Sequence, residues 1–356
     1  MQGAVVSAPD PAVHPNAVIT VSDLRMVYPG PNAEASPTVA LDGVGFYVGR
    51  GEIFGFLGPN GAGKTTTISI LTTLLKPTSG HATVEGLDVA VRPDEVRRML
   101  GLVFQKSTAD EELTGRENMM LQAGLYGQSG PAVSARITEL LARMDLATVG
   151  DRFVKTYSGG MRRRLELAVG MVHGPKLLFL DEPTLGLDPQ GRAGFWSYIR
   201  SLRENEGMTV FMTTHYLDEA DQLCDRIAVI DHGKIIALGT PKQLKDGVGG
   251  DSLEVTVAPG SPDLAPLVQK MPGVKAVTRR DDTYRVKCLS GEQLVPKVVL
   301  TAEQAGITVR GVTVVKPTLD EVFLDLTGRA YREEGETPKP EAAAPPTPTA
   351  GEGERP

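Results

Sequence analysis

The feature that most constrains this 356-residue chain is a glycine-rich loop, GPNGAGKT, at residues 58–65. It directly follows a short apolar run, Ile53–Leu57, and the residues after it place Ile68, Leu71 and Leu75 on one helical face. These three parts predict a strand, a loop and a helix in succession. Glycines let the backbone N–H groups of such a loop turn toward phosphate oxygens, and the helix N-terminus adds positive potential. We therefore expect the loop to bind a nucleoside triphosphate.

Individual loop residues suit different parts of that ligand. The amine of Lys64 can reach the terminal phosphates, and the hydroxyl of Thr65 is a suitable ligand for Mg²⁺. The predicted nucleotide-binding residues of the loop are Gly58, Pro59, Asn60, Gly61, Ala62, Gly63, Lys64, Thr65 and Thr66.

A pair of acidic residues, Asp181 and Glu182, follows a second strand-like run at residues 176–180. Such a pair alone more often opens a loop, but beside a phosphate loop two carboxylates can divide the chemistry of hydrolysis. We expect Asp181 to hold Mg²⁺ through its water shell and Glu182 to polarise the attacking water.

The balance of charged residues limits the classes of partner. Lys and Arg number 37 against 44 Asp and Glu, and the net charge of −7 argues against a protein that coats nucleic acid. No segment approaches the roughly 18 consecutive apolar residues that cross a bilayer, and the first residues lack the pattern of a signal peptide. We expect the chain to stay in the compartment where it is made, with Cys224 and Cys288 as buried thiols.

The first patterned region spans residues 17–245. Short apolar runs alternate there with helical patterns, which predicts an α/β domain with a largely parallel sheet. An amphipathic pattern at residues 132–146 predicts a helix within a helical subdomain at about 106–165.

A glycine-rich stretch at residues 245–251 predicts a linker to a second region. Residues 252–328 show the order βαββαβ and then a short helix, which predicts a small α+β domain of the ferredoxin-like type. The tails, 1–16 and 331–356, are rich in proline with few large apolar residues, and we expect both to be disordered.

Further motifs follow the phosphate loop in order. Gln105 comes after an apolar run, YSGGM spans residues 157–161, DEPTLGLD spans 181–188, and His215 ends the next strand. In this order, over residues 17–245, the motifs resemble those of ATP-binding cassette (ABC) proteins, which implies a P-loop NTPase fold with a helical insertion.

Two longer segments narrow the resemblance to one group of ABC proteins. Residues 213–241 and 316–329 are similar to the ATPase subunits of ABC-2 drug exporters of the daunorubicin-resistance type. The implied function is an ATP-hydrolysing subunit, with ATP and Mg²⁺ as cofactors, that powers export of a hydrophobic drug, antibiotic or lipid-like compound.

The resemblance also implies a role for each motif residue. Tyr28 stacks on adenine, Gln105 senses Mg²⁺ and the attacking water, and His215 orients the reaction as a neutral imidazole. Met161 stands where glutamine is more usual in the family, which removes a polar side chain from that position. The residues implied to contact the nucleotide of the opposite protomer are Ser158, Gly159, Gly160 and Asp188.

The implied assembly has several chains. Hydrolysis requires a head-to-tail dimer, because each chain holds one phosphate loop and one YSGGM segment; the second cassette is another copy or a homologous ATPase subunit. Transport requires a separate integral-membrane permease. We expect the chain at the cytoplasmic face of a bacterial cell membrane, with no nucleic acid partner.

Two other functions stay open on the sequence. A soluble ABC ATPase acting on ribosomes or DNA usually carries tandem cassettes or long coiled-coil insertions, and neither pattern occurs here. The presence of Glu182 and His215 argues against a regulatory module without turnover. We interpret the basic run 162–164 as solvated or nucleotide-proximal charge rather than a DNA contact, since three consecutive residues point around most of a helix.

The short helix near residue 320 closes the second region. Leu319, Val322, Phe323 and Leu326 recur at intervals of three and four, so we expect this stripe to be buried. It can pack against its own sheet, or against the cassette or a partner protomer, where it would tune dimer closure. Residues 252–328 contain none of the motif residues, and we expect a protein-contact or regulatory role for them.

Overall fold

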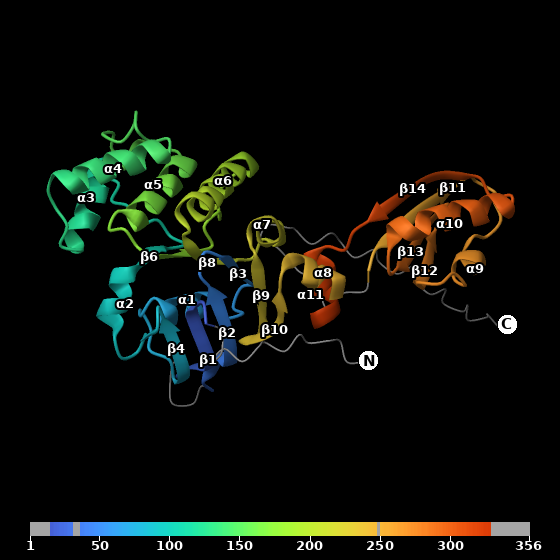
Figure 1. The fold of residues 1–356 in the computed structure, drawn as a ribbon, viewed down its shortest axis with the longest axis horizontal. Helices are drawn as coiled ribbons and strands as arrows, with labels where there is room; N and C mark the ends of the chain where they lie inside the picture. The colour runs from blue at the N-terminus through green and yellow to red at the C-terminus, as the bar shows by residue number, and fades with distance from the viewer. Residues whose placement is uncertain (1–14, 31–35, 248–249, 329–356) are drawn as a thin grey trace, which may run out of the picture.

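The computed structural model describes residues 15–30, 36–247 and 250–328. Figure 1 shows a larger α/β part, coloured blue to yellow, and a smaller C-terminal part in orange. The expected disorder of residues 331–356, and of residues 1–14 within the N-terminal tail, concerns segments outside the described residues.

The main sheet has six strands in the order β10-β9-β3-β8-β7-β6. Neighbouring strands pair in parallel except β9 and β10, which are antiparallel, so the expected parallel-rich sheet is confirmed. The apolar runs predicted as strands at residues 53–57 and 176–180 form two of its interior strands, which are buried on both faces and therefore carry continuous apolar sequence. The strands are β3 (Ile53–Leu57), β6 (Leu100–Val103), β7 (Leu177–Asp181), β8 (Thr209–Thr214), β9 (Arg226–Asp231) and β10 (Lys234–Gly239).

A second sheet, which the sequence interpretation missed, is antiparallel with the order β2-β1-β4-β5. Its strands are β1 (Ala17–Tyr28), β2 (Thr38–Gly49), β4 (Ser79–Val84) and β5 (Leu87–Asp88). The two sheets share one core, in which the ring of Phe46 lies 5.4 Å from that of Phe54 and 5.9 Å from that of Phe211. Side chains of β3, the strand that precedes the phosphate loop, belong to this core.

Helices cover the main sheet and form the helical subdomain. The predicted stripe of the subdomain is buried at Ile137, Leu140 and Leu141. The hydroxyl of Thr114 accepts the N–H of Glu117 while the Glu117 carboxylate accepts the N–H of Thr114, which fixes the start of α3. The helices are α1 (Lys64–Leu71), α2 (Pro93–Met99), α3 (Gly115–Leu125), α4 (Pro131–Arg143), α5 (Gly159–Met171), α6 (Pro189–Glu206), α7 (Leu217–Leu223) and α8 (Pro241–Gly247), with a 3-10 turn, η2, at Val154–Thr156. Among the described residues no helix is long and apolar enough to cross a membrane.

The C-terminal part has the expected βαββαβ order and an antiparallel sheet, β12-β13-β11-β14. Its first helix is short, and α8 extends three residues into the predicted linker, to Gly247. The elements are β11 (Ser252–Val257), α9 (Ala265–Val268), β12 (Val274–Arg280), β13 (Thr283–Cys288), α10 (Gly291–Gln304) and β14 (Val309–Val315).

The last helix, α11 (Leu319–Thr327), leaves this sheet and packs against the larger part, beside α7 and α8 (Figure 1). Val322 and Phe323 are buried in the same apolar cluster as Leu244, whereas Leu326 is 40% exposed, contrary to the expected stripe.

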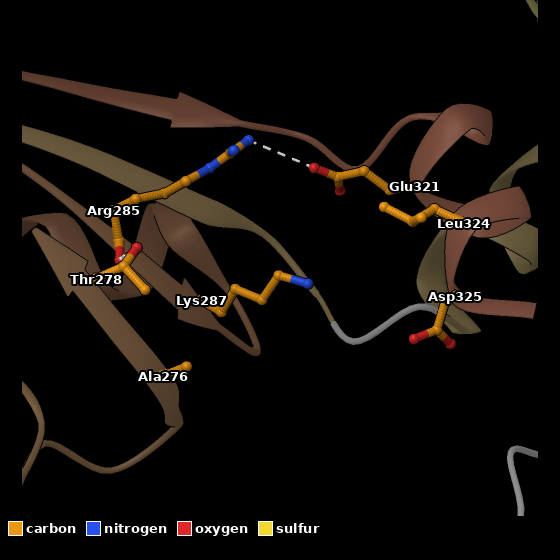
Figure 2. A pocket seen from close by; sticks show the side chains of 7 residues that line it. All are labelled: Ala276, Thr278, Arg285, Lys287, Glu321, Leu324 and Asp325. Carbon is orange, nitrogen blue, oxygen red and sulfur yellow. Dashed lines mark hydrogen bonds and ion pairs between the residues drawn. The ribbon is translucent and has the colours of Figure 1, made fainter. Parts of the chain in front are cut away.

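A cleft of about 340 Å³ separates α11 from the sheet of the C-terminal part. Across it the guanidinium of Arg285 lies 3.4 Å from the Glu321 carboxylate (Figure 2). The sequence left open whether this helix packs against its own sheet or against the cassette. In the structure α11 packs against the cassette.

Candidate functional site

The phosphate loop joins the carboxyl end of β3 to α1, and two of its glycines have no room for a side chain. A Cβ atom at Gly58 would lie 2.3 Å from the carbonyl oxygen of Ile230, and one at Gly63 would lie 2.7 Å from that of Ala40. Gly63 also has a φ of 112°, which favours glycine. The loop is therefore a tight backbone cradle that ends at a helix N-terminus, as phosphate binding requires.

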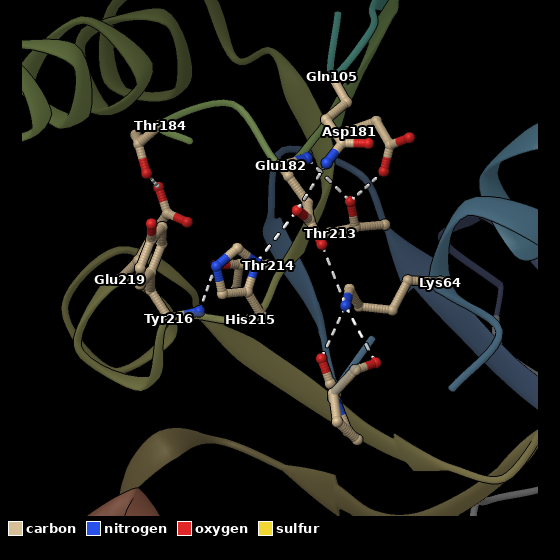
Figure 3. Close-up of polar contacts among 12 residues, drawn as sticks. Lys64, Gln105, Asp181, Glu182, Thr184, Thr213, Thr214, His215, Tyr216 and Glu219 are labelled. Carbon is tan, nitrogen blue, oxygen red and sulfur yellow. Dashed lines mark hydrogen bonds and ion pairs between the residues drawn. The ribbon is translucent and has the colours of Figure 1, made fainter. Parts of the chain in front are cut away.

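The amine of Lys64 lies inside this cradle and is only 4% exposed. It donates to the carbonyl oxygens of Gly58 at 2.7 Å and Pro59 at 3.2 Å, and lies 3.1 Å from Glu182 Oε1 (Figure 3). The amine is thus held between the loop and the acidic pair, close to both.

Asp181 ends β7 beside the phosphate loop. The hydroxyl of Thr213, at the end of β8, donates to Asp181 Oδ1 at 2.6 Å. Burial raises the pKa of Asp181, and hydrogen bonds from Thr213 and Thr65 together with the charge of Lys64 oppose that rise. Thr65 and Asp181 therefore share one polar site, as two oxygen ligands for one cation would.

Glu182 receives contacts from two further predicted catalytic residues. Gln105 Nε2 donates to Glu182 Oε2 at 3.2 Å, and His215 Nδ1 lies 3.1 Å from the same oxygen (Figure 3). Burial alone would raise the pKa of Glu182, but the hydrogen bond from His215 and the charge of Lys64 outweigh it, so the pKa is lowered. The carboxylate is consequently ionised at neutral pH, as a general base must be.

The residues around the loop fit a nucleotide bound with Mg²⁺. Among the described residues no group of three or more His, Cys, Asp or Glu side chains could hold a metal alone. Mg²⁺ commonly takes only one or two protein ligands and completes its shell with phosphates and water, so Thr65 and Asp181 suffice. The hydroxyl of Tyr28 lies 3.4 Å from that of Thr66, which places this ring beside the loop; its adenine contact stays a prediction.

The remaining predicted residues lie in a different place. Ser158, Gly159, Gly160 and Asp188 line a hollow of about 800 Å³ between α5 and α6, and no phosphate-loop residue lines it. Ser158 Oγ accepts the N–H of Met161 at 3.3 Å at the start of α5, and the Met161 side chain packs against the apolar core. One chain therefore contains the predicted site as two separate halves.

Two buried polar residues near the site were missed by the sequence interpretation. Thr213 Oγ1 donates to Asp181 Oδ1 and accepts the backbone N–H of Glu182 at 3.0 Å. Glu219 on α7 is fully buried and accepts hydrogen bonds from Thr184 at 2.9 Å and Trp196 at 3.0 Å, and burial raises its pKa. Both residues lie in the segment 213–219 around His215, and this closeness in sequence was the signal that could have identified them.

The interpretation of the basic run 162–164 as solvated or nucleotide-proximal charge is wrong for Arg163, which is 7% exposed. Its guanidinium hydrogen-bonds backbone carbonyls at the ends of β6 and β7. Arg162 pairs with Glu111 at 2.7 Å, and Arg164 donates to Tyr198 Oη at 3.2 Å. Three consecutive side chains point in different directions on a helix, so one of them faces the core.

Comparison with known proteins gives two family matches. Residues 41–185 match the model of the ABC transporter family, and residues 239–327 match the ATP-binding protein DrrA1-3-like, C-terminal domain.

Several curated proteins are similar over nearly their whole length. The daunorubicin resistance ATP-binding protein DrrA3 of Streptomyces coeruleorubidus is 45% identical, over 86% of this chain and 97% of that protein. The daunorubicin/doxorubicin resistance ATP-binding protein DrrA of Streptomyces peucetius is 43% identical, over 88% and 93%. The linearmycin resistance ATP-binding protein LnrL of Bacillus subtilis (strain 168) is 35% identical, over 82% and 95%.

Solved structures share the fold of the larger part. The ATP-binding subunit of an ABC transporter superimposes with a TM-score of 0.55 at 29% identity, over 64% of this chain and 92% of that chain. A dimeric structure of a bacterial ABC transporter cassette gives a TM-score of 0.56 at 26% identity, over 62% and 98%.

Proposed function

Because this chain belongs to the ATP-binding subunits of ABC transporters, with a DrrA-like C-terminal domain, we propose that it powers antibiotic or drug export through a separate membrane permease. The chain is an ATP hydrolase of that family. The observation that carries the catalytic part of the proposal is the convergence of Lys64, Gln105 and His215 on the Glu182 carboxylate.

Glu182 acts as the general base in this proposal. Its lowered pKa keeps it ionised, and water at its carboxylate would lie beside Lys64, which reaches the terminal phosphates. His215 holds the carboxylate from the opposite side, and Gln105 contacts the same oxygen as His215. Bound Mg²⁺ would supply charge neutralisation on the phosphates, held by Thr65 and Asp181.

A head-to-tail dimer is supported by the separation of the two halves of the site. Ser158, Gly160 and Asp188 face a hollow that contains no phosphate-loop residue. A second chain turned head to tail would bring its phosphate loop to this hollow, and a nucleotide would be enclosed between the two. The dimeric cassette among the similar structures is in keeping with this arrangement.

The surface of the helical subdomain supports contact with a permease at the cytoplasmic face of the membrane. Three large apolar side chains of α3 are strongly exposed: Met120 at 52%, Leu121 at 54% and Leu125 at 75%. Phe104, directly before Gln105, is 39% exposed. Exposed apolar groups that gather on one surface commonly mark protein interfaces, and those of α3 would meet the permease.

The proposed cargo follows from the relatives, which are named as resistance proteins for daunorubicin, doxorubicin and linearmycin. A soluble ABC ATPase acting on ribosomes or DNA is not favoured, because these relatives are resistance proteins and this chain is acidic overall.

Co-purification from membranes followed by a vesicle assay tests the proposal. We expect the wild-type chain to co-purify with one integral-membrane protein, and inverted vesicles containing both to accumulate doxorubicin or linearmycin when MgATP is supplied. Vesicles with Lys64→Ala should accumulate neither. Sedimentation of the chain with ribosomes and absence from membranes would contradict the proposal.

A further inference from the structure

Arg163 connects three segments of the site from inside the protein. Its Nη1 donates to the Phe104 carbonyl at 2.7 Å, and its Nε donates to the Pro183 carbonyl. Its Nη2 lies 3.3 Å from the Glu182 carbonyl oxygen and 3.4 Å from that of Asp181. The guanidinium therefore bridges the end of β6 and the end of β7 from a position on α5.

The counter-charge of Arg163 is also buried. Glu166, one turn further along α5 and 6% exposed, accepts from Arg163 Nη1 at 2.6 Å. A buried guanidinium is costly unless its donors are satisfied, and its planar fork can serve several acceptors at once. Here the fork contacts the main chain of the two segments that carry Gln105 and Glu182.

The backbone at Glu182 needs such support. Glu182 has a φ of 47°, in the left-handed region that is strained for any residue except glycine. Its N–H donates to Thr213, and its carbonyl oxygen faces Arg163. Surrounding contacts of this kind are what keep a strained residue in place.

We propose that Arg163 is a positioning residue for hydrolysis, which holds the main chain of residues 104 and 181–183 so that Gln105 and Glu182 of its own chain are correctly oriented. The proposal rests on the proposed function. Because Ser158, which would meet the partner's nucleotide, caps the N-terminus of α5, Arg163 on the same helix also connects the partner's site to the Glu182 of its own chain.

Single variants of the full chain give the first test. Arg163→Met is expected to bind MgATP like the wild type in calorimetry but to lower kcat by about 100-fold, the loss typical of a ~1 Å misplacement. Arg162→Met is the matched control, because Arg162 is the preceding residue of α5 and its guanidinium pairs with the Glu111 carboxylate; this variant should keep the wild-type kcat. Loss of kcat at unchanged MgATP affinity, in a variant that remains folded at the assay temperature, separates positioning from mere stability.

A second variant covers the case in which Arg163→Met does not fold. Arg163→Lys keeps a charge beside Glu166, but one amine cannot bridge both segments. We expect it to fold, to bind MgATP normally and to lose kcat. Wild-type kcat in a folded Arg163→Lys or Arg163→Met variant overturns the proposal.

Mixing inactive variants then shows on which site Arg163 acts. Gly160→Asp damages only the half-site offered to the partner, and a side chain there meets nothing within 4 Å. A mixture of Arg163→Met with Gly160→Asp should regain activity, because the Gly160→Asp chain supplies an intact phosphate loop, Glu182 and Arg163. A mixture of Arg163→Met with Lys64→Ala should stay inactive, since its only intact phosphate loop lies in the Arg163→Met chain.

The opposite pattern of rescue would place the effect of Arg163 at Ser158 and overturn the proposal. The mixture of Lys64→Ala with Gly160→Asp tests the dimer separately. If that mixture stays inactive, the head-to-tail dimer is wrong, and the kcat of the single variants still decides the role of Arg163.

Discussion

The Glu182 carboxylate is surrounded by groups whose contributions to its pKa have opposite signs. Burial favours the neutral acid, whereas the hydrogen bond from His215 and the charge of Lys64 favour the carboxylate and prevail. Asp181, one residue earlier, has its pKa raised by burial. Neighbouring acids with pKa values moved apart in this way suit different tasks, one as a base and the other as a metal ligand.

Glu182→Gln should abolish steady-state hydrolysis while MgATP still binds. The amide keeps the shape of the side chain but cannot accept a proton from water, and loss of a general base costs about 10²–10⁴-fold in rate. We expect an ATP-bound dimer to accumulate, visible by light scattering. Glu139→Gln, on the exposed face of α4, is the control. Turnover at the wild-type rate in Glu182→Gln would show that another group is the base.

The pH dependence of kcat reports on the contact between His215 and Glu182. Because the pKa of Glu182 is lowered, its carboxylate is charged at every pH above the ordinary glutamate pKa. The activity and the folding stability that depend on this charge are present there, and both are lost as the pH falls through the lower pKa of the folded protein. His215→Ala removes the hydrogen bond, so the acidic limb of kcat should move to higher pH. His81→Ala, at an exposed position, should leave that limb unchanged. An unmoved limb in His215→Ala would contradict the assigned contact.

At the scale of elements, α11 is a C-terminal helix docked on the cassette. Phe323 is 2% exposed and belongs to the apolar cluster that includes Leu217 of α7 and Leu244 of α8. The α7 helix also carries the buried Glu219, which contacts Thr184 just after the acidic pair. Packing on α7 therefore gives the C-terminal part a physical connection to the site.

Phe323→Asp should release α11 from the cassette. Burying an unpaired carboxylate costs several kcal/mol, about enough to undo the docking of one short helix. We expect faster proteolysis after residue 315 and weaker ATP-driven dimerisation and transport, with unchanged MgATP binding by the monomer. The control, Leu324→Asp, places the same charge at a position that is 47% exposed. Normal dimerisation and full drug resistance in a stable Phe323→Asp variant would rule out a role for this docking.

At the scale of the whole molecule, one chain carries two half-sites that do not meet. The phosphate loop lies at the end of β3, and the hollow lined by Ser158 and Asp188 lies between α5 and α6. With this geometry, we expect ATP hydrolysis to require a dimer rather than a single chain. Arg163 lies on α5, the helix that Ser158 caps, and contacts the main chain at Phe104 and Glu182, so it connects the two half-sites within one chain.

Deletion of residues 332–356 should leave the melting temperature and the ATPase rate unchanged. Their composition, rich in proline with few large apolar residues, cannot supply a core or contribute much buried surface. Differential scanning calorimetry and a coupled ATPase assay measure both. A marked drop in either would mean that this segment docks on the rest of the chain.

The sequence by itself determined the features that depend on near neighbours. A strand, a glycine-rich loop and a helix follow one another directly at the phosphate site, and the interior strands are continuous apolar runs. The order of elements in the C-terminal part followed from local periodicity as well. The roles of Gln105 and His215 came from a resemblance, because neither residue has a local pattern that indicates chemistry.

Only the tertiary structure decided which distant residues meet. The antiparallel sheet, the burial of Arg163 against residues 104 and 181–183, and the docking of α11 on α7 and α8 all join segments that lie far apart in sequence. From sequence alone, an arginine on a helix is expected to be a solvated charge. Its burial becomes clear only when the tertiary structure shows which backbone carbonyls it contacts. Likewise an apolar stripe shows that a helix face is buried but not which surface covers it, since burial of apolar area is non-directional.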